Sequence, residues 1–185
     1  MANVNVAPQV NAPSIGSSAM LVELKISCWT GRKKDKSASA TVTSQNYADK
    51  GTASVNKMLL GKCDELIAIQ KFVANVRNIN YDATMPWSDL GQRLLTMPVY
   101  FKHHPILTGL QTEFYRMADA FCNGYWVEVS RAQARIGSLH RAEDYPSEDA
   151  IRSKFNFTIS YIPLPDAGDF RVDIGNEQKQ VLKDH

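Results

Sequence analysis

The sequence predicts an α+β fold, in which a small antiparallel sheet from the N- and C-terminal strands carries a long helical insertion on one face. Apolar and polar residues alternate over 21–28 and 155–161, which is the period of a half-buried strand. Between these segments, apolar residues recur with the spacing of amphipathic helices. The N-terminal strand needs partners to bury its apolar face, and the C-terminal segments are the strongest candidates.

Residues 1–18 are expected to be a flexible arm outside the domain. They hold Asn, Pro, Gly, Ser and scattered Val, without charge or periodicity, and cannot form a core of their own. Two interpretations stay open: a disordered terminus, or a segment that becomes ordered on a neighbouring subunit. Residues 19–185 are predicted to form a single α+β domain, because 185 residues suffice for one hydrophobic core.

The N-terminal half is predicted to contain one strong strand and one long helix. The strand over 21–28 runs into a turn of dense positive charge over 29–36. A short helix is expected over 37–47. The spacing of apolar residues then predicts a long amphipathic helix over 54–79, although Gly61 weakens one of its turns.

The middle of the chain is predicted to be helical. Ser88 is a candidate cap for a short helix over 87–97, between two prolines. Longer helices are expected over 106–121 and 126–136. The dipeptide Asn123-Gly124 ends or breaks the first of these.

The C-terminal part is predicted to return to strand after one more helical turn. Ser147 precedes two acidic residues and is expected to cap a short helix. Alternation over 155–161 and again over 170–174 predicts an antiparallel pair of strands. This pair is expected to lie beside the N-terminal strand.

Composition excludes several classes of protein. The apolar fraction is 44% and the charged fraction 22%, as in ordinary globular proteins. No stretch approaches the roughly 20 apolar residues of a spanning helix, and the N-terminus lacks the pattern of a secretory signal. The three cysteines, Cys28, Cys63 and Cys122, are odd in number and widely spaced, which indicates free thiols in a reducing compartment. We therefore expect a soluble cytoplasmic protein without membrane contact.

Motifs for chemistry are missing from the sequence. It has no Walker loop and no Gly-x-Gly-x-x-Gly pattern, and its Ser, Cys and His residues stand in no nucleophile motif. His103 and His104 are adjacent, so their side chains point in different directions and rarely share a metal ion. The sequence therefore predicts a protein that is not an enzyme and holds no metal and no cofactor.

A basic cluster beside a tryptophan is the sharpest local feature. Trp29 is followed closely by Arg32, Lys33, Lys34 and Lys36. Cations that contact phosphates, beside a ring on which a base stacks, are the combination that single-strand binding proteins use. A solvated turn at the end of a strand explains the same residues, and both interpretations stay open.

A second basic set consists of Arg131, Arg135 and Arg141. The first two are spaced to share one face of a helix, and the third lies slightly beyond it. If the fold brings this set beside the Trp29 cluster, the case for a nucleic-acid interface becomes stronger.

Several segments resemble an uncharacterised protein family of tailed-phage and prophage genomes. They are 21–33, 86–89 with 91–95, and 151–155 with 168–174. The resemblance covers nearly the whole chain from about residue 21. It implies a phage protein of the host cytoplasm or the virion, and the family has no assigned activity or catalytic residues. Some of its members are encoded beside MoxR-type AAA ATPases, which makes such an ATPase an expected partner.

Two functional hypotheses follow. The first is a phage-encoded, non-enzymatic homo-oligomer that binds nucleic acid, specifically single-stranded DNA, in replication or recombination. The second is a protein-interaction or assembly module that does not bind nucleic acid, either an adaptor for an AAA ATPase or a component of the virion. An enzyme is the third and least favoured class.

Overall fold

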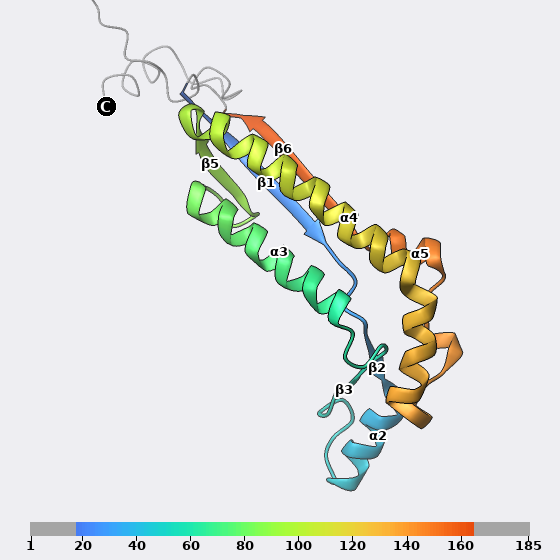
Figure 1. The fold of residues 1–185 in the computed structure, drawn as a ribbon. Helices are drawn as coiled ribbons and strands as arrows, with labels where there is room; N and C mark the ends of the chain where they lie inside the picture. The colour runs from blue at the N-terminus through green and yellow to red at the C-terminus, as the bar shows by residue number, and fades with distance from the viewer. Residues whose placement is uncertain (1–17, 165–185) are drawn as a thin grey trace, which may run out of the picture.

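The structure is a computed structural model that describes residues 18–164. Its α+β class confirms the prediction: a four-stranded antiparallel sheet, in the order β4-β5-β1-β6, lies against two long helices (Figure 1). A separate two-stranded ribbon, β2-β3, carries a short helix. The elements are β1 (Ala19–Ser27), β2 (Arg32–Asp35), α2 (Lys36–Gln45), β3 (Val55–Met58), α3 (Asp64–Ala83), β4 (Met85–Pro86), β5 (Gln92–Thr96), α4 (Met97–Ile136), α5 (Glu148–Arg152) and β6 (Asn156–Pro163).

The sheet joins the two ends of the described chain, as the sequence predicts. Strand β1 pairs with β6 in a register that runs from Met20 opposite Pro163 to Ser27 opposite Asn156. The alternating side chains of β1 place Val22, Leu24 and Ile26 on one face of the sheet. That face is the one covered by the helices. The strand predicted over 170–174 lies outside the described residues.

The other edge of β1 is occupied by a strand from the insertion, which corrects the short helix predicted over 87–97. Gln92–Thr96 is strand β5, and Leu94 lies opposite Leu21 of β1. Ser88 does not cap a helix; it belongs to a turn in which its backbone N–H donates to the Gln92 carbonyl. The backbone groups of residues 92–96 find hydrogen-bond partners on the free edge of β1. A short isolated helix would leave many of the same groups to water.

The long helix predicted over 54–79 begins later than expected. Residues 55–58 form β3, and α3 starts only at Asp64. A turn at Gly61 separates them, where the backbone has φ +58. Glycine adopts this conformation without strain, whereas other residues rarely do. The apolar residues of β3 and of the turn happen to keep the spacing of a helix, which is why the sequence predicted one long helix here.

The helices predicted over 106–121 and 126–136 form one helix of 40 residues, α4. Pro105 lies inside it, and Asn123-Gly124 does not break it. Buried residues continue on both sides of these positions, with His103 and Leu107 around the proline and Cys122 and Tyr125 around the glycine. An uninterrupted buried face outweighs the local cost of proline and glycine in a helix.

Three further predictions are confirmed. Helix α5 begins after Ser147, whose hydroxyl oxygen accepts the backbone N–H of Ala150 at 3.4 Å. The three cysteines are free. Helix α2 matches the helix expected over 37–47. The arm predicted over 1–18 lies outside the described residues, apart from Ser18.

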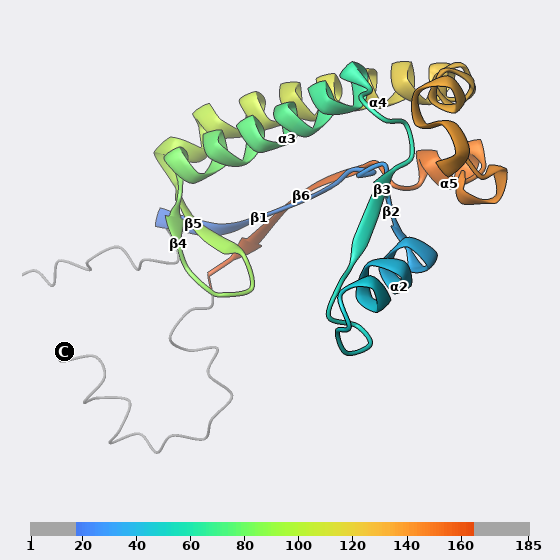
Figure 2. The same cartoon turned by 90° about the horizontal axis from the view of Figure 1, so that it is seen from below.

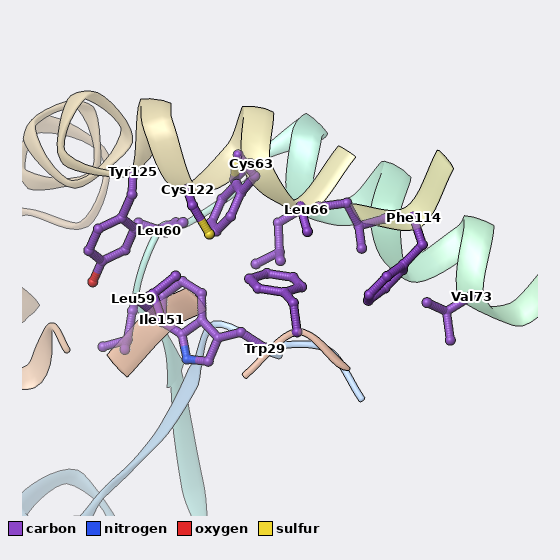
Figure 3. Close-up of a cluster of buried hydrophobic side chains, with 14 of the residues drawn as sticks. Trp29, Leu59, Leu60, Cys63, Leu66, Val73, Phe114, Cys122, Tyr125 and Ile151 are labelled. Carbon is purple, nitrogen blue, oxygen red and sulfur yellow. The ribbon is translucent and has the colours of Figure 1, made fainter. Parts of the chain in front are cut away.

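The main core lies between the helices and the sheet (Figure 3). Trp29, just beyond the end of β1, is only 8% exposed and packs between α4 and the turn before α3. Its ring lies 6.2 Å from the ring of Phe121 and 5.8 Å from that of Tyr125. Such tilted and edge-on aromatic pairs add to the stabilisation from burial.

The ribbon and α2 project from one end of the sheet, on the side away from α3 and α4 (Figure 2). Two hydrogen bonds lie at the base of the ribbon: the first closes the ribbon, and the second joins it to the body. Leu59 donates its backbone N–H to the Gly31 carbonyl at 2.7 Å, and the Tyr145 hydroxyl donates to the Leu59 carbonyl at 2.6 Å. Gly31 has φ +66, and a Cβ there would lie 2.9 Å from the Leu66 side chain. The joint therefore requires glycine at this position.

We predict that Trp29→Ala lowers the free energy of unfolding by about 3–5 kcal/mol, because it leaves a cavity beneath α4. Urea denaturation followed by circular dichroism measures the change. Trp126→Ala is the matched control, since Trp126 is 51% exposed on α4; its change should be about 1 kcal/mol or less. Equal effects of the two substitutions would contradict a structural role for Trp29.

Candidate nucleic-acid interface

Residues 30–62, which we call the basic lobe, contain most of the unbalanced positive charge of the protein. The lobe holds seven basic and two acidic residues, a formal charge of +5, whereas the whole chain has +2. The remainder of the chain is therefore slightly acidic. A projecting lobe of one charge sign attracts polyanions at long range.

Strand β2 distributes its cations over both faces of the ribbon. Its side chains alternate, so Arg32 and Lys34 lie on one face and Lys33 on the other. Lys33 is directly opposite Lys57 of β3, and two like charges in this position repel each other. The ribbon therefore needs a counter-ion at this pair.

Asp144 provides that counter-ion. One carboxylate oxygen lies 2.7 Å from the Lys33 Nζ, and the other contacts the Nζ of buried Lys57. Lys57 also donates to the Leu139 carbonyl at 3.2 Å. Hydrogen bonds from Lys33 and then from Lys57 hold the pKa of Asp144 below its usual range. This ion-pair cluster fixes the ribbon to the segment that follows α4.

Helix α2 is held by caps and cross-links, since its sequence of small polar residues offers little apolar surface. The Asp35 carboxylate accepts the backbone N–H of Ala38 at 2.9 Å, as an N-cap. The Ser39 hydroxyl donates to the Asp35 carbonyl and accepts the backbone N–H of Val55 at 3.0 Å. These bonds place α2 against β3 and expose its first turn beside Lys34.

An open groove of about 670 Å³ lies between α2 and the loop that follows it. Three lysines line it: Lys34 from β2, Lys36 from the start of α2, and Lys50 from the loop. Within residues 18–164 none of the three forms an ion pair. The other lining residues are all Ser, Thr, Ala or Gly. The groove thus offers unpaired cations, hydroxyls and little steric bulk.

The second basic set is mostly engaged in ion pairs. Buried Glu128 lies between two arginines, with the Arg131 Nη1 at 2.5 Å and the Arg135 Nη1 at 3.2 Å. Burial alone would raise the pKa of Glu128, but hydrogen bonds from both arginines outweigh it and lower that pKa. Arg135 also donates to the carbonyls of Leu60 and Lys62. Arg135 therefore helps to attach the basic lobe to α4, whereas Arg131 is paired within the helix.

The fold brings the two predicted sets to the same end of the molecule, although only part of them stays available. Lys33 contacts Asp144, whose backbone N–H donates to the carbonyl of Arg141. Arg141 is exposed and, among residues 18–164, forms no ion pair. The same holds for Arg32. At this end of the described chain, the exposed cations without an ion pair are Arg32, Lys34, Lys36, Lys50 and Arg141.

Trp29 cannot serve as the stacking ring that the sequence suggested. Its indole lies in the core with only 8% of its surface exposed, because the chain must pass beneath α4 before it enters the basic lobe. Lys50 was missed by sequence reasoning. It follows Lys36 by a helix and a loop, and it joins the groove only because that loop folds back along α2. No local motif in the sequence marks this proximity.

Three potential metal ligands lie close together where the lobe meets α3 and α4. Side-chain atoms of Cys63, Glu65 and Glu128 lie within 4.8 Å of one another. Burial raises the pKa of the Cys63 thiol to about 11, so the thiolate that a metal would require is disfavoured. Glu128 already binds its two arginines. The group does not fit a metal site.

No family model, no curated protein and no solved structure matches this chain. The resemblance to a phage family therefore stays a prediction. Over residues 18–164, no helix is both long enough and apolar enough to span a bilayer.

We predict that Asp144→Asn destabilises the protein by about 1–3 kcal/mol at pH 7, because Lys57 is buried and loses its charged acceptor. The folded pKa of Asp144 is lowered, so its contribution is present above the unfolded value near 3.9 and is lost as the pH falls through the folded value. Urea midpoints measured from pH 7 to pH 2 should begin to converge for the parent and the variant below about pH 4, and should coincide only below the folded pKa of Asp144. Exposed Asp89→Asn is the control, and a constant difference across this pH range would contradict the assignment.

Proposed function

We propose that the protein is a phage-encoded, non-enzymatic, homo-oligomeric protein of the host cytoplasm that binds nucleic acid, specifically single-stranded DNA, through its basic lobe. One observation carries the proposal: three lysines without ion pairs line a single open groove on the most basic part of the chain. Replication and recombination, which expose single strands, are the proposed setting.

The chemistry of the groove suits a phosphate backbone. Lysine side chains neutralise phosphates and release the counter-ions condensed on them, which drives binding without reading sequence. Groove-lining residues with small side chains, such as Ala40, Ala48 and Gly51, leave room for a strand to approach the protein backbone. We therefore expect affinity that depends on salt and little on base sequence.

A single strand fits this groove better than a duplex. Double-stranded DNA is stiff over about 150 base pairs, so it would touch the projecting lobe only along its outer surface. A flexible strand can bend into the groove and contact Lys34, Lys36 and Lys50 together. Single-strand binding proteins combine a basic groove with this kind of backbone tracking.

We predict that the triple variant Lys34→Gln, Lys36→Gln, Lys50→Gln binds oligo(dT) on the order of 100-fold more weakly at 0.1 M salt, because three phosphate contacts are lost. The slope of log K against log salt should fall by about 2 in magnitude. Fluorescence anisotropy of labelled oligo(dT), titrated at several salt concentrations, measures both quantities. Titrations with oligo(U) and with duplex DNA determine whether single-stranded DNA is the preferred ligand.

The matched control replaces three exposed lysines outside the basic lobe, Lys71→Gln, Lys102→Gln and Lys154→Gln. This control has the same net charge as the groove variant and should bind almost as tightly as the parent. Equal weakening of both variants would reduce the effect to overall charge, and absence of salt-sensitive binding by the parent would refute the proposal.

A second candidate function is supported by exposed apolar residues on the β4–β5 hairpin, at the edge of the sheet. Around the β4–β5 turn, Leu90 is 84% exposed, Met85 56% and Trp87 51%. A contiguous patch of large exposed apolar residues often marks a site of protein–protein contact. We propose a protein-interaction or assembly role for the β4–β5 hairpin. Its partner would be an AAA ATPase, a virion component or another copy of the chain.

We predict that the double variant Trp87→Ser, Leu90→Ser lowers the oligomeric state seen by native mass spectrometry, because the apolar contact between copies is lost. The control, Val127→Ser with Leu139→Ser, removes apolar residues that are exposed to a similar degree elsewhere. It should keep the parent's mass. A parent that is monomeric at all concentrations would exclude self-association through this surface.

A further inference from the structure

Tyr47 has no role within the described fold. Its surface is 99% exposed, and it follows α2 at the tip of the basic lobe. Within residues 18–164 its ring takes part in no aromatic pair, and its hydroxyl in no hydrogen bond. An aromatic side chain that lies wholly in water contributes nothing to the core.

The backbone of Tyr47 also opposes a structural explanation. It has φ +52, and among the described non-glycine residues it alone has a positive φ. Its N–H donates to the Ser44 carbonyl at 3.2 Å, and the next N–H, of Ala48, donates to the Thr43 carbonyl at 3.0 Å. At this position after a helix, glycine or asparagine is the usual residue. Tyr47 thus has an unfavourable backbone conformation, although its ring makes no contribution to the core. This combination indicates that the ring has a role outside the fold.

The position of Tyr47 relates it to the groove. Ser44 and Ala48, which flank it in the chain, both line the groove, and Lys50 follows three residues later. Tyr47 does not itself line the groove, but the lining residues on both sides of it place this residue next to the rim of the groove. A strand whose phosphates contact the three lysines of the groove has its bases within reach of the rim.

We propose that Tyr47 is the platform on which an unpaired base stacks while the adjoining phosphates contact Lys34, Lys36 and Lys50. This inference rests on the proposed function and names its ligand more closely, as a single strand with an accessible base face. In a duplex the base faces are covered by their neighbours, so a ring selects unpaired bases. Tyr47 would then have the role that the sequence assigned to Trp29.

The test compares Tyr47→Gly, Tyr47→Phe and Tyr47→Trp with the parent. Tyr47→Gly removes the ring and relieves the backbone, so the melting temperature should not fall. Its affinity for oligo(dT) should drop roughly 5- to 150-fold with the salt slope unchanged, because stacking is lost and phosphate contacts remain. Tyr47→Phe should bind like the parent. Tyr47→Trp should show quenching of the added tryptophan emission when oligo(dT) binds.

The outcomes separate this inference from the proposed function. If Tyr47→Gly binds oligo(dT) as tightly as the parent while the triple lysine variant binds weakly, the stacking role is overturned and the basic groove stands. If Tyr47→Gly weakens duplex and single-strand binding equally, stacking on an unpaired base is likewise overturned. If the parent binds no oligonucleotide, both proposals fall.

Discussion

The burial of Trp29 determines how the basic lobe is joined to the rest of the molecule. The chain leaves β1 and passes beneath α4, where the Trp29 indole packs against Phe121 and Tyr125. It then turns at Gly31 into the ribbon. The ribbon then returns to the body at Leu59, one hydrogen bond away from Gly31. Because both ends of the lobe start from this packed aromatic site, its orientation is coupled to the core.

Carboxylates in the body decide which cations remain available. Asp144 neutralises the repelling pair Lys33 and Lys57, and Glu128 binds Arg131 and Arg135. The lobe itself is held by Asp144, and by Arg135 through its hydrogen bonds to the carbonyls of Leu60 and Lys62. The lysines of the groove have no such partners in the described chain, so paired and unpaired cations separate by position. A basic cluster in a sequence is therefore a poor measure of the positive surface that a ligand meets.

The proposed single-strand site uses two properties that come from different sources. Affinity comes from long-range and local attraction between lysines and phosphates, which salt weakens. In this proposal, selectivity for unpaired bases comes from the exposed ring of Tyr47 beside the groove, and salt affects stacking little. The apolar β4–β5 hairpin lies at the edge of the sheet, whereas the basic lobe lies beyond the end of β1 (Figure 1). Assembly and nucleic-acid binding could therefore proceed on separate surfaces.

The sequence by itself determined the α+β class, the pairing of β1 with β6, the capped helix after Ser147 and the basic character of the lobe. These depend on local periodicity, on capping chemistry and on charge, all of which can be read without contacts. The tertiary structure alone decided that Gln92–Thr96 is a strand and that α4 continues past Pro105 and Gly124. In both cases a long-range partner, the edge of β1 or the buried face of α4, outweighed local propensity. The tertiary structure also decided that Trp29 is buried and that Lys50 lies in the same groove as Lys34. Packing determines which residues that are distant in the chain lie close together in space, and local sequence patterns do not show it.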